Sequence, residues 1–213
     1  MTPRCLHHTG TLLVLDKPSG MAVHRASGDE SADLTSWAME HYDAGMAPAH
    51  RLDRDTSGVV LLSSCPRERA ELNQLFAQGD VHKTYLALVL GATRKKGVIS
   101  RPLPDARRGR ALDATTRYKR LEAFGSASLL EVRPETGRKH QIRRHLHTIG
   151  HPLVGDRRYR DPRRRRVFAF PGRLWLHACQ LELPHGRVFS SPLPKMLTEH
   201  LELLRGLELA DDA

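Results

Sequence analysis

Short apolar runs alternate with turn residues at the start of the chain. TLLVL (residues 11–15) indicates a strand. DKPSG (16–20) predicts a turn, because proline and glycine both favour one. MAVH (21–24) then resumes an extended pattern, so we expect two strands joined by a turn.

The next segments predict a helix, a strand and a second helix. Apolar residues recur at helical spacing over residues 31–42, and either Ser31 or Asp33 can cap the start of this helix. GVVLLSS (58–64) is rich in branched apolar residues, which is typical of a buried strand. PRERAELNQLFAQGD (66–80) has proline in its first turn and a glycine as its stop, so it predicts a helix.

The middle of the chain predicts three more strands. KTYLALVLG (83–91) is partly alternating and rich in strand-forming residues. Residues 92–113 are charged and lack a period, and we expect mostly loop there. TTRYKRLEAFG (115–125) and SASLLEVRP (126–134) read as two strands that meet at Gly125.

The C-terminal part predicts a helix, a strand and a last helix. RKHQIRRHLHTIGHP (138–152) places apolar residues at helical spacing, with basic residues and histidines on its other faces. LWLHACQLELP (174–184) indicates a strand and PKMLTEHLELLRGLE (194–208) a helix. Strands outnumber helices without strict alternation, and no long linker divides the chain. The pattern favours one α+β domain over residues 1–213, with a mixed, mostly antiparallel sheet flanked by helices and loops.

The charge changes this picture of an ordinary domain. The 34 lysines and arginines exceed the 24 acidic residues by 10, and 27 of them are arginine. Arginine suits phosphate and base edges, so a polyanion such as nucleic acid is the first candidate partner. The alternative is that a GC-rich genome encodes arginine in place of lysine.

Several classes of protein are disfavoured by what the sequence lacks. The three cysteines are odd in number and widely spaced, which indicates reduced thiols of a cytoplasmic protein. There is no apolar run long enough for a membrane span and no signal peptide. Neither metal-ligand spacings nor nucleotide-binding glycine motifs occur, so we expect no metal and no cofactor.

HRLDRDTSG (50–58) concentrates charge and hydroxyls between two apolar runs. Asp55 and the residues after it are explained by a turn before the strand. Asp53 is flanked by Arg51 and Arg54, and an arginine nearby keeps a carboxylate ionised for use as a nucleophile or base. A simple surface ion pair is the alternative.

The start of the basic helix is a candidate phosphate-binding site. Its first residues would be Arg138, Lys139 and His140, at the positive end of the helix dipole, although a solvated helix face explains the same pattern. With the basic segments RRGR and RDPRRRR it predicts a surface for folded RNA. The residues expected to bind RNA are Arg54, Arg138, Lys139, His140, Arg144, Arg163, Arg164, Arg165 and Arg166.

These motifs resemble, in order, those of the RluA family of pseudouridine synthases. The segments are LDKPSGMAVH, HRLDRDTSGVVLL, KTYLALV, ATTRYKRLEAF, SLLEVRPETGRKHQIRRHLHTIGHPLVGD and LHACQLELPHG, which together cover about residues 12–186. The resemblance implies a single pseudouridine-synthase-type catalytic domain that isomerises uridine in RNA without metal or cofactor. The first motif begins near residue 12, so no separate N-terminal RNA-binding domain is expected.

The resemblance also implies roles for four residues. The family's essential aspartate falls on Asp53, its active-site tyrosine on Tyr85, and the arginine that pairs with the aspartate on Arg143. Arg51 lies where similar enzymes insert an arginine into the gap left by a flipped base. Whether Asp53 attacks a carbon or removes a proton stays open.

The substrate is the least specified part of this interpretation. The double arginine in HQIRRHL looks more like the family's tRNA-modifying, TruC-like branch than its ribosomal branch, so tRNA is favoured over ribosomal RNA. No obligatory protein partner is expected. The alternatives are a catalytically inactive RNA-binding protein of the same fold, which would have lost one of the three catalytic residues, and a metal-dependent nuclease, which would need clustered carboxylates.

Overall fold

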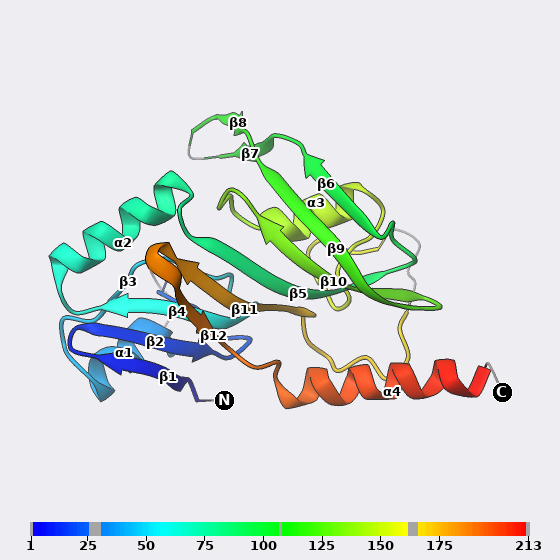
Figure 1. Ribbon diagram of the computed structural model, residues 1–213, viewed down its shortest axis with the longest axis horizontal. Coiled ribbons are helices and arrows are strands. Elements are labelled where there is room, and N and C mark those ends of the chain that lie inside the picture. The colour runs from blue at the N-terminus through cyan, green and yellow to red at the C-terminus, as the bar shows by residue number, and fades with distance from the viewer. Residues whose placement is uncertain (1, 26–30, 107, 162–165, 212–213) are drawn as a thin grey trace. The chain divides into compact units, whose positions relative to one another are not determined.

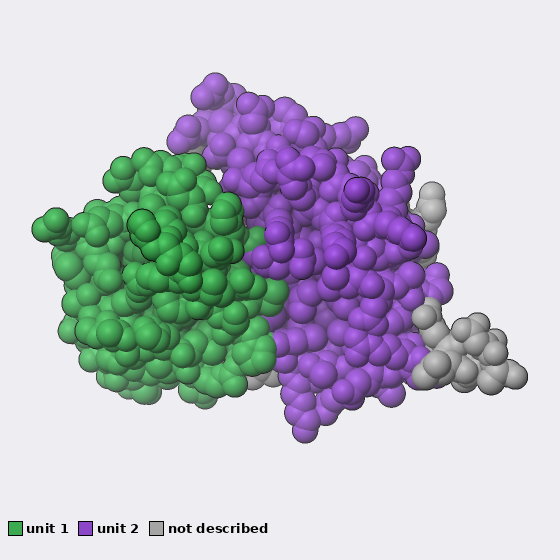
Figure 2. Space-filling model, viewed as in Figure 1, with its two compact units in different colours: residues 1–83, 178–192 green, residues 84–177, 193–213 purple. Residues whose placement is uncertain are grey.

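The structure is a computed structural model that describes residues 2–25, 31–106, 108–161 and 166–211 (Figure 1). The chain forms two compact units (Figure 2), and each is described here by itself. Unit 1 comprises Met1–Lys83 and Ala178–Pro192, and unit 2 comprises Thr84–His177 and Leu193–Ala213. Helices and antiparallel strands occur in both, which confirms the α+β fold class. The single domain over residues 1–213 stays a prediction.

Unit 1 is built around a sheet with the strand order β1-β2-β4-β11. β2 pairs antiparallel with β1 and β4, β3 pairs with β4, and β12 pairs with β11. The strands are β1 (Arg4–Thr9), β2 (Leu12–Lys17), β3 (Ala47–Pro48), β4 (Ser57–Ser63), most of β11 (Leu176–Leu183) and β12 (Arg187–Ser190); the helices are α1 (Leu34–His41) and α2 (Pro66–Gln78).

The uninterrupted apolar runs of unit 1 are explained by burial on both faces of the sheet. Val14 of β2 and Leu61 of β4 belong to a core cluster that also receives Leu72 of α2. Their neighbours in sequence, such as Leu13 and Leu62, point the other way and are also fully buried. A strand covered on both sides has no position that favours a polar residue.

The strands of unit 2 pair antiparallel in the order β5-β10-β9-β6. A separate two-stranded ladder joins β7 and β8. The strands are β5 (His82–Leu90), β6 (Lys96–Ser100), β7 (Leu103–Asp105), β8 (Arg110–Leu112), β9 (Thr115–Phe124) and β10 (Ala127–Pro134); the helices are α3 (Gln141–Thr148) and α4 (Lys195–Asp211). The chain passes between the units within β5, within β11, and again between Pro192 and Leu193 before α4.

The sheet of unit 2 is covered by a different helix on each face. Val89 of β5 clusters with Leu146 of α3, whereas the adjacent Leu88 clusters with Trp175 and with Leu201 of α4. This alternation follows from the two-residue period of a strand. The face that packs against α3 is the one that also carries Tyr85.

Three parts of the sequence-based fold were wrong. β1 and β12 were not predicted, and residues 21–24 form no strand but only a parallel bridge from Ala22 to Asp33. The segment expected to be loop, 92–113, contains β6, β7 and β8. The helices near residues 31–42 and 66–80 are confirmed as α1 and α2, with Asp33 as the side-chain cap of α1 and Gly79 ending α2.

Candidate active site

Asp53 lies on a loop of unit 1 between β3 and β4. Leu52 is buried, so its neighbours Arg51 and Asp53 are turned toward the surface, where Arg51 is exposed and Asp53 half-buried. The Thr56 amide donates to the Asp53 carbonyl at 3.1 Å, which closes a turn over residues 53–56, two residues earlier than the turn expected at DTSG (55–58). Gly58 follows with φ +121°, and a Cβ there would lie 2.1 Å from the Ala178 carbonyl oxygen, so only glycine fits.

A buried lysine fixes the backbone beside Asp53. Lys17 is fully buried, and its Nζ donates to the carbonyls of Pro18 (2.9 Å), Met21 (2.7 Å) and Arg54 (3.0 Å). The Arg54 carbonyl also accepts from the Gly20 amide at 2.9 Å. The predicted turn at 16–20 and Arg54, which directly precedes the predicted DTSG turn (55–58), are therefore held together by one cation.

A side-chain contact adds to this clamp. The Ser19 hydroxyl donates to the Asp55 carbonyl at 2.6 Å. Asp55 thus contributes to the turn through its backbone, which fits the structural role expected of it. Both neighbours of Asp53 in the sequence are fixed: the side chain of Leu52 is buried, and the carbonyl of Arg54 is bound by Lys17.

His50 anchors the other end of the loop in its neutral form. Its Nε2 accepts from the Leu61 amide at 3.0 Å, and its ring lies 4.4 Å from that of Phe76. Burial, together with the positive charge of Lys83, lowers the pKa of His50 to about 3. Burial also lowers the pKa of Lys83. An imidazole that stays neutral can keep accepting this backbone hydrogen bond across the physiological pH range.

Tyr85 lies in unit 2, two residues after Lys83 on β5. It pairs in register with Val132 of β10 and packs, partly buried, against the cluster beneath α3. Its ring is therefore supported on one side by the sheet of unit 2. Asp53 belongs to unit 1, so the encounter of these two residues stays a prediction.

Arg143 is held by a carboxylate that the sequence did not single out as its partner. Its Nε and Nη2 each donate to Asp156 at 2.8 Å, and both side chains are almost completely buried. Burial alone would raise the pKa of Asp156, but hydrogen bonds from Arg143 and from the backbone amides of Tyr159 and Arg158 lower it. Asp156 therefore orients Arg143 within unit 2. The pairing of Arg143 with Asp53 stays a prediction.

Tyr159 extends this network on the surface side. The Arg143 guanidinium lies 5.4 Å from the Tyr159 ring centroid, and the Tyr159 hydroxyl is 3.0 Å from His140 Nδ1. His140 has φ +55° and precedes the first residue of α3. The candidate RNA-binding residue His140 is thus linked to Arg143 through Tyr159.

The phosphate seat at the start of α3 needs correction. α3 begins at Gln141, so Arg138, Lys139 and His140 form the turn before the helix instead of its first residues. The helix starts late because Gln141 is buried and bound on both sides: its Oε1 accepts from Thr136 Oγ1 and the Arg138 amide, and its Nε2 donates to Thr115 O and Thr116 Oγ1.

The remaining basic residues divide into anchored and exposed ones. Arg144 donates to the Pro104 carbonyl at 3.1 Å and Arg138 to the Asp113 carbonyl at 3.1 Å. Lys139, Arg54 and Arg166 are exposed. Arg163, Arg164 and Arg165 lie outside the described residues. Among the three residues before α3, Lys139 is the exposed one, and phosphate binding there stays a prediction.

The described residues contain neither a metal-binding cluster nor a membrane-spanning helix. No group of three histidine, cysteine or acidic residues there is arranged to hold a metal ion. No described helix is long and apolar enough to cross a membrane. His145 of α3 is buried, its two ring nitrogens lie within hydrogen-bond distance of Thr116 Oγ1 and the Arg101 carbonyl, and burial lowers its pKa.

Comparison with known proteins assigns the family. The sequence pattern of the RNA pseudouridylate synthases matches residues 11–148, which contain Asp53, Tyr85 and Arg143. The chain belongs to the RNA pseudouridylate synthase family. The resemblance noted from the sequence motifs is confirmed.

Relatives of this synthase family carry names for two kinds of RNA. The chain is 37% identical over 220 residues to a ribosomal large subunit pseudouridine synthase D from Nitrosomonas europaea, covering 92% of this chain and 63% of that protein. It is 34% identical over 206 residues to a tRNA pseudouridine synthase C from Salmonella typhimurium, covering 84% and 79%. The chain thus spans about three fifths of the length of the synthase D relative.

Solved structures of the synthase family share the fold. Human RNA pseudouridylate synthase domain containing 4 superposes with a TM-score of 0.80 at 27% identity, covering 94% of this chain and 92% of that one. Human RNA pseudouridylate synthase domain containing 1 gives a TM-score of 0.75 at 23% identity. The first of these matches covers nearly the whole length of both chains.

Sequence reasoning missed the residues that hold this synthase site in shape. Lys17, Gln141 and Asp156 are all buried polar residues within the recognised motifs. A lysine at the end of an apolar run, as in VLDK, was the available signal, because a charge placed there must be buried with partners or turned out to solvent.

Proposed function

We propose that this chain isomerises uridine to pseudouridine in RNA, with Asp53 as the essential carboxylate. The N1–C1′ bond breaks, the uracil turns, and a C5–C1′ bond forms; C5 loses its proton to solvent and N1 gains one. The observation that carries the proposal is the anchored loop: Lys17, Ser19 and Gly20 hold the backbone on one side of Asp53, and buried Leu52 holds the other. Such fixed placement is what a reacting group requires.

The neighbouring residues support complementary roles. Arg51, exposed two residues before Asp53, is placed to fill the gap that a flipped uridine leaves, which lowers the cost of flipping. Tyr85 offers a supported aromatic face on which uracil can stack and a hydroxyl for proton transfer. Arg143, aligned by Asp156, would keep Asp53 ionised when the base excludes water.

The substrate that we propose is tRNA in preference to ribosomal RNA. The HQIRRHL motif and the broad coverage of the tRNA pseudouridine synthase C relative support it. The relatives named for ribosomal RNA make that the competing substrate. Mapping pseudouridines in total RNA from cells with and without the protein would decide between them, because the lost sites identify the RNA.

The decisive experiment compares the two aspartates of the loop. With RNA that carries tritium at C5 of uridine, in excess EDTA and without cofactor, wild type should release tritium. Asp53→Asn should release none while binding RNA nearly as well, and Asp55→Asn should keep substantial activity because Asp55 acts through its carbonyl. Tritium release by Asp53→Asn would refute the assignment.

The same assay tests the alternative that the chain is an RNA-binding protein without catalytic activity. If this alternative were right, the wild-type chain would bind RNA but release no tritium from any cellular RNA. The retention of Asp53, Tyr85 and Arg143 together favours the enzyme.

A further inference from the structure

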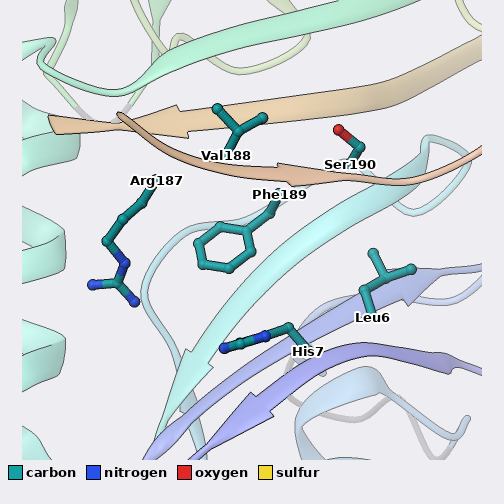
Figure 3. Close-up of a pocket in the computed structure, with 6 residues that line it drawn as sticks. All are labelled: Leu6, His7, Arg187, Val188, Phe189 and Ser190. Atoms are coloured by element: carbon teal, nitrogen blue, oxygen red, sulfur yellow. The ribbon is translucent and has the colours of Figure 1, made fainter. Parts of the chain in front are cut away.

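A pocket of about 380 Å³ lies in unit 1, lined by residues to which the proposed reaction assigns no role. Leu6 and His7 of β1 and Arg187, Val188, Phe189 and Ser190 of β12 line it (Figure 3). Its volume lies within the range of pockets that hold small organic groups, which begins at about 300 Å³.

The pocket forms where two strands meet without a ladder. Among the described strands, β1 pairs with β2 and β12 pairs with β11, and β1 and β12 contact each other. The turn Pro184–Gly186 folds β12 back along β11, with His185 and Gly186 both at positive φ. Side chains, not backbone hydrogen bonds, therefore fill the seam between β1 and β12.

The side chains in the seam combine one flat apolar ring with nitrogen-rich groups. Phe189 packs on one side against the core cluster of unit 1. The Arg187 guanidinium lies 5.8 Å from its ring centroid, and the His7 ring lies 5.5 Å away at an angle of 47°. His7 is oriented by a 2.8 Å hydrogen bond between its Nε2 and Thr9 Oγ1. Figure 3 shows Arg187, Phe189 and His7 directed into the space between the two strands.

We infer that this pocket binds one unpaired nucleotide of RNA, with the base against Phe189 and His7 and the adjoining phosphate on Arg187. Aromatic rings next to cations are the general means of holding single-stranded RNA. None of the six lining residues is acidic, and the chain has a net charge of +10, so the pocket suits an anion. The inference rests on the proposed function, since it takes RNA as the substrate.

The pocket suits a nucleotide within a strand better than a free nucleotide. One arginine matches the single charge of a phosphodiester, whereas the terminal phosphates of free nucleotides are usually held by several donors such as a glycine-rich loop or a helix N-terminus. None of the pocket-lining residues belongs to an α-helix. A chain of RNA can reach the pocket from outside because its lining residues His7, Arg187 and Ser190 are exposed.

The test measures fluorescence anisotropy of a labelled ten-nucleotide oligouridylate and of a blunt ten-base-pair RNA duplex. Phe189→Leu keeps an apolar side chain against the core but removes the flat ring, and should weaken binding of oligouridylate about tenfold without affecting the duplex. Phe189→Trp should restore binding. Arg187→Gln should lower the affinity for oligouridylate and reduce the slope of its salt dependence by about 0.7.

The control is Arg67→Gln, which removes an exposed arginine of α2 paired with Glu71. It should leave oligouridylate binding within about twofold of wild type. Unchanged binding by both Phe189→Leu and Arg187→Gln would overturn the inference. So would displacement of oligouridylate by millimolar uridine monophosphate or inorganic phosphate, because the site would then be one for small phosphates.

Tritium release by the same preparations separates this inference from the proposed function. If wild type releases tritium and Phe189→Leu does not change oligouridylate binding, the proposed function is supported and the pocket inference is refuted. If wild type releases no tritium but oligouridylate binding depends on Phe189, the proposed function is refuted and the pocket is supported as an RNA-binding site. Arg67→Gln, which lies outside both the pocket and the proposed active site, should keep the wild-type rate at saturating RNA.

Discussion

At the scale of single residues, the position of Asp53 depends on Lys17, which is far from it in sequence, and on the nearby His50, whose partner lies on β4. Lys17 binds three carbonyls, one of which belongs to Arg54, and His50 accepts the amide of Leu61. Asp53, Tyr85 and Arg143 could be named from sequence because their motifs resemble a family. The supporting residues could not, because a hydrogen bond between segments 37 residues apart leaves no periodic pattern.

Replacing Lys17 should loosen the loop. Lys17→Met keeps most of the volume but removes the donor to the Pro18 and Met21 carbonyls and one of two donors to the Arg54 carbonyl, so we expect a loss of about 2 to 4 kcal/mol of unfolding free energy. Turnover should fall more than RNA affinity, because Asp53 loses its fixed position. Urea unfolding and single-turnover rates would measure both. Lys195→Met, at an exposed site of α4, should change neither, and equal effects of the two substitutions would contradict the clamp.

His50 should make the folded state sensitive to acid. Its folded pKa of about 3 lies below the ordinary value of 6.5, so the unfolded chain takes up the proton first as the pH falls. Stability from this residue is therefore complete above pH 6.5 and declines below it, by about 2 kcal/mol between pH 7 and pH 5. In urea unfolding, His50→Gln should flatten this decline, while the exposed His82→Gln should follow wild type. An unchanged slope in His50→Gln would show that its burial is not maintained.

At the scale of elements, strands with apolar runs were predictable and edge strands were not. β2, β4, β5, β9 and β10 carry enough apolar residues to mark them. β1 is mostly exposed with the sequence RCLHHT, and β12 has only four residues. Neither strand therefore has an apolar pattern from which it could be predicted. β6, β7 and β8 are short and charged, and their pairing depends on partners elsewhere in the chain. The late start of α3 follows from the buried Gln141, whose bonds are tertiary.

The stability of α3 and of the segment after it should depend on the ion pair between Arg143 and Asp156, which joins them. Asp156→Ala leaves the Arg143 guanidinium buried without its carboxylate, and we expect a loss of about 3 to 5 kcal/mol of unfolding free energy. Glu135→Ala removes the acidic partner from the exposed pair with Arg117 and should cost less than about 1 kcal/mol. Urea unfolding of the two variants makes the comparison. Similar small losses in both would mean that Asp156 does not hold Arg143.

At the scale of the whole molecule, the net charge of +10 attracts RNA, while only a few cations should act on the reaction. The structure divides the predicted basic residues by what holds them. Arg143 is buried on Asp156, Arg138 and Arg144 are each bound to a carbonyl, and Lys139 and Arg51 are exposed. Composition alone treats all of them as equivalent. Burial and partners give each group a different expected effect on affinity, salt dependence and rate.

Binding against salt, combined with single-turnover rates at saturating RNA, should separate these cations. Lys139→Ala should weaken binding of any RNA and reduce the salt slope by up to about one unit, because one phosphate contact and its released counterion are lost. Arg143→Ala should lower the saturated rate far more than affinity, because a buried arginine does not meet phosphate. Arg51→Ala should lose rate on a paired target uridine and recover part of it on an unpaired one, where flipping is cheaper. If all three variants lose affinity in parallel and keep the wild-type saturated rate, these residues form one undifferentiated basic surface and the separate roles are wrong.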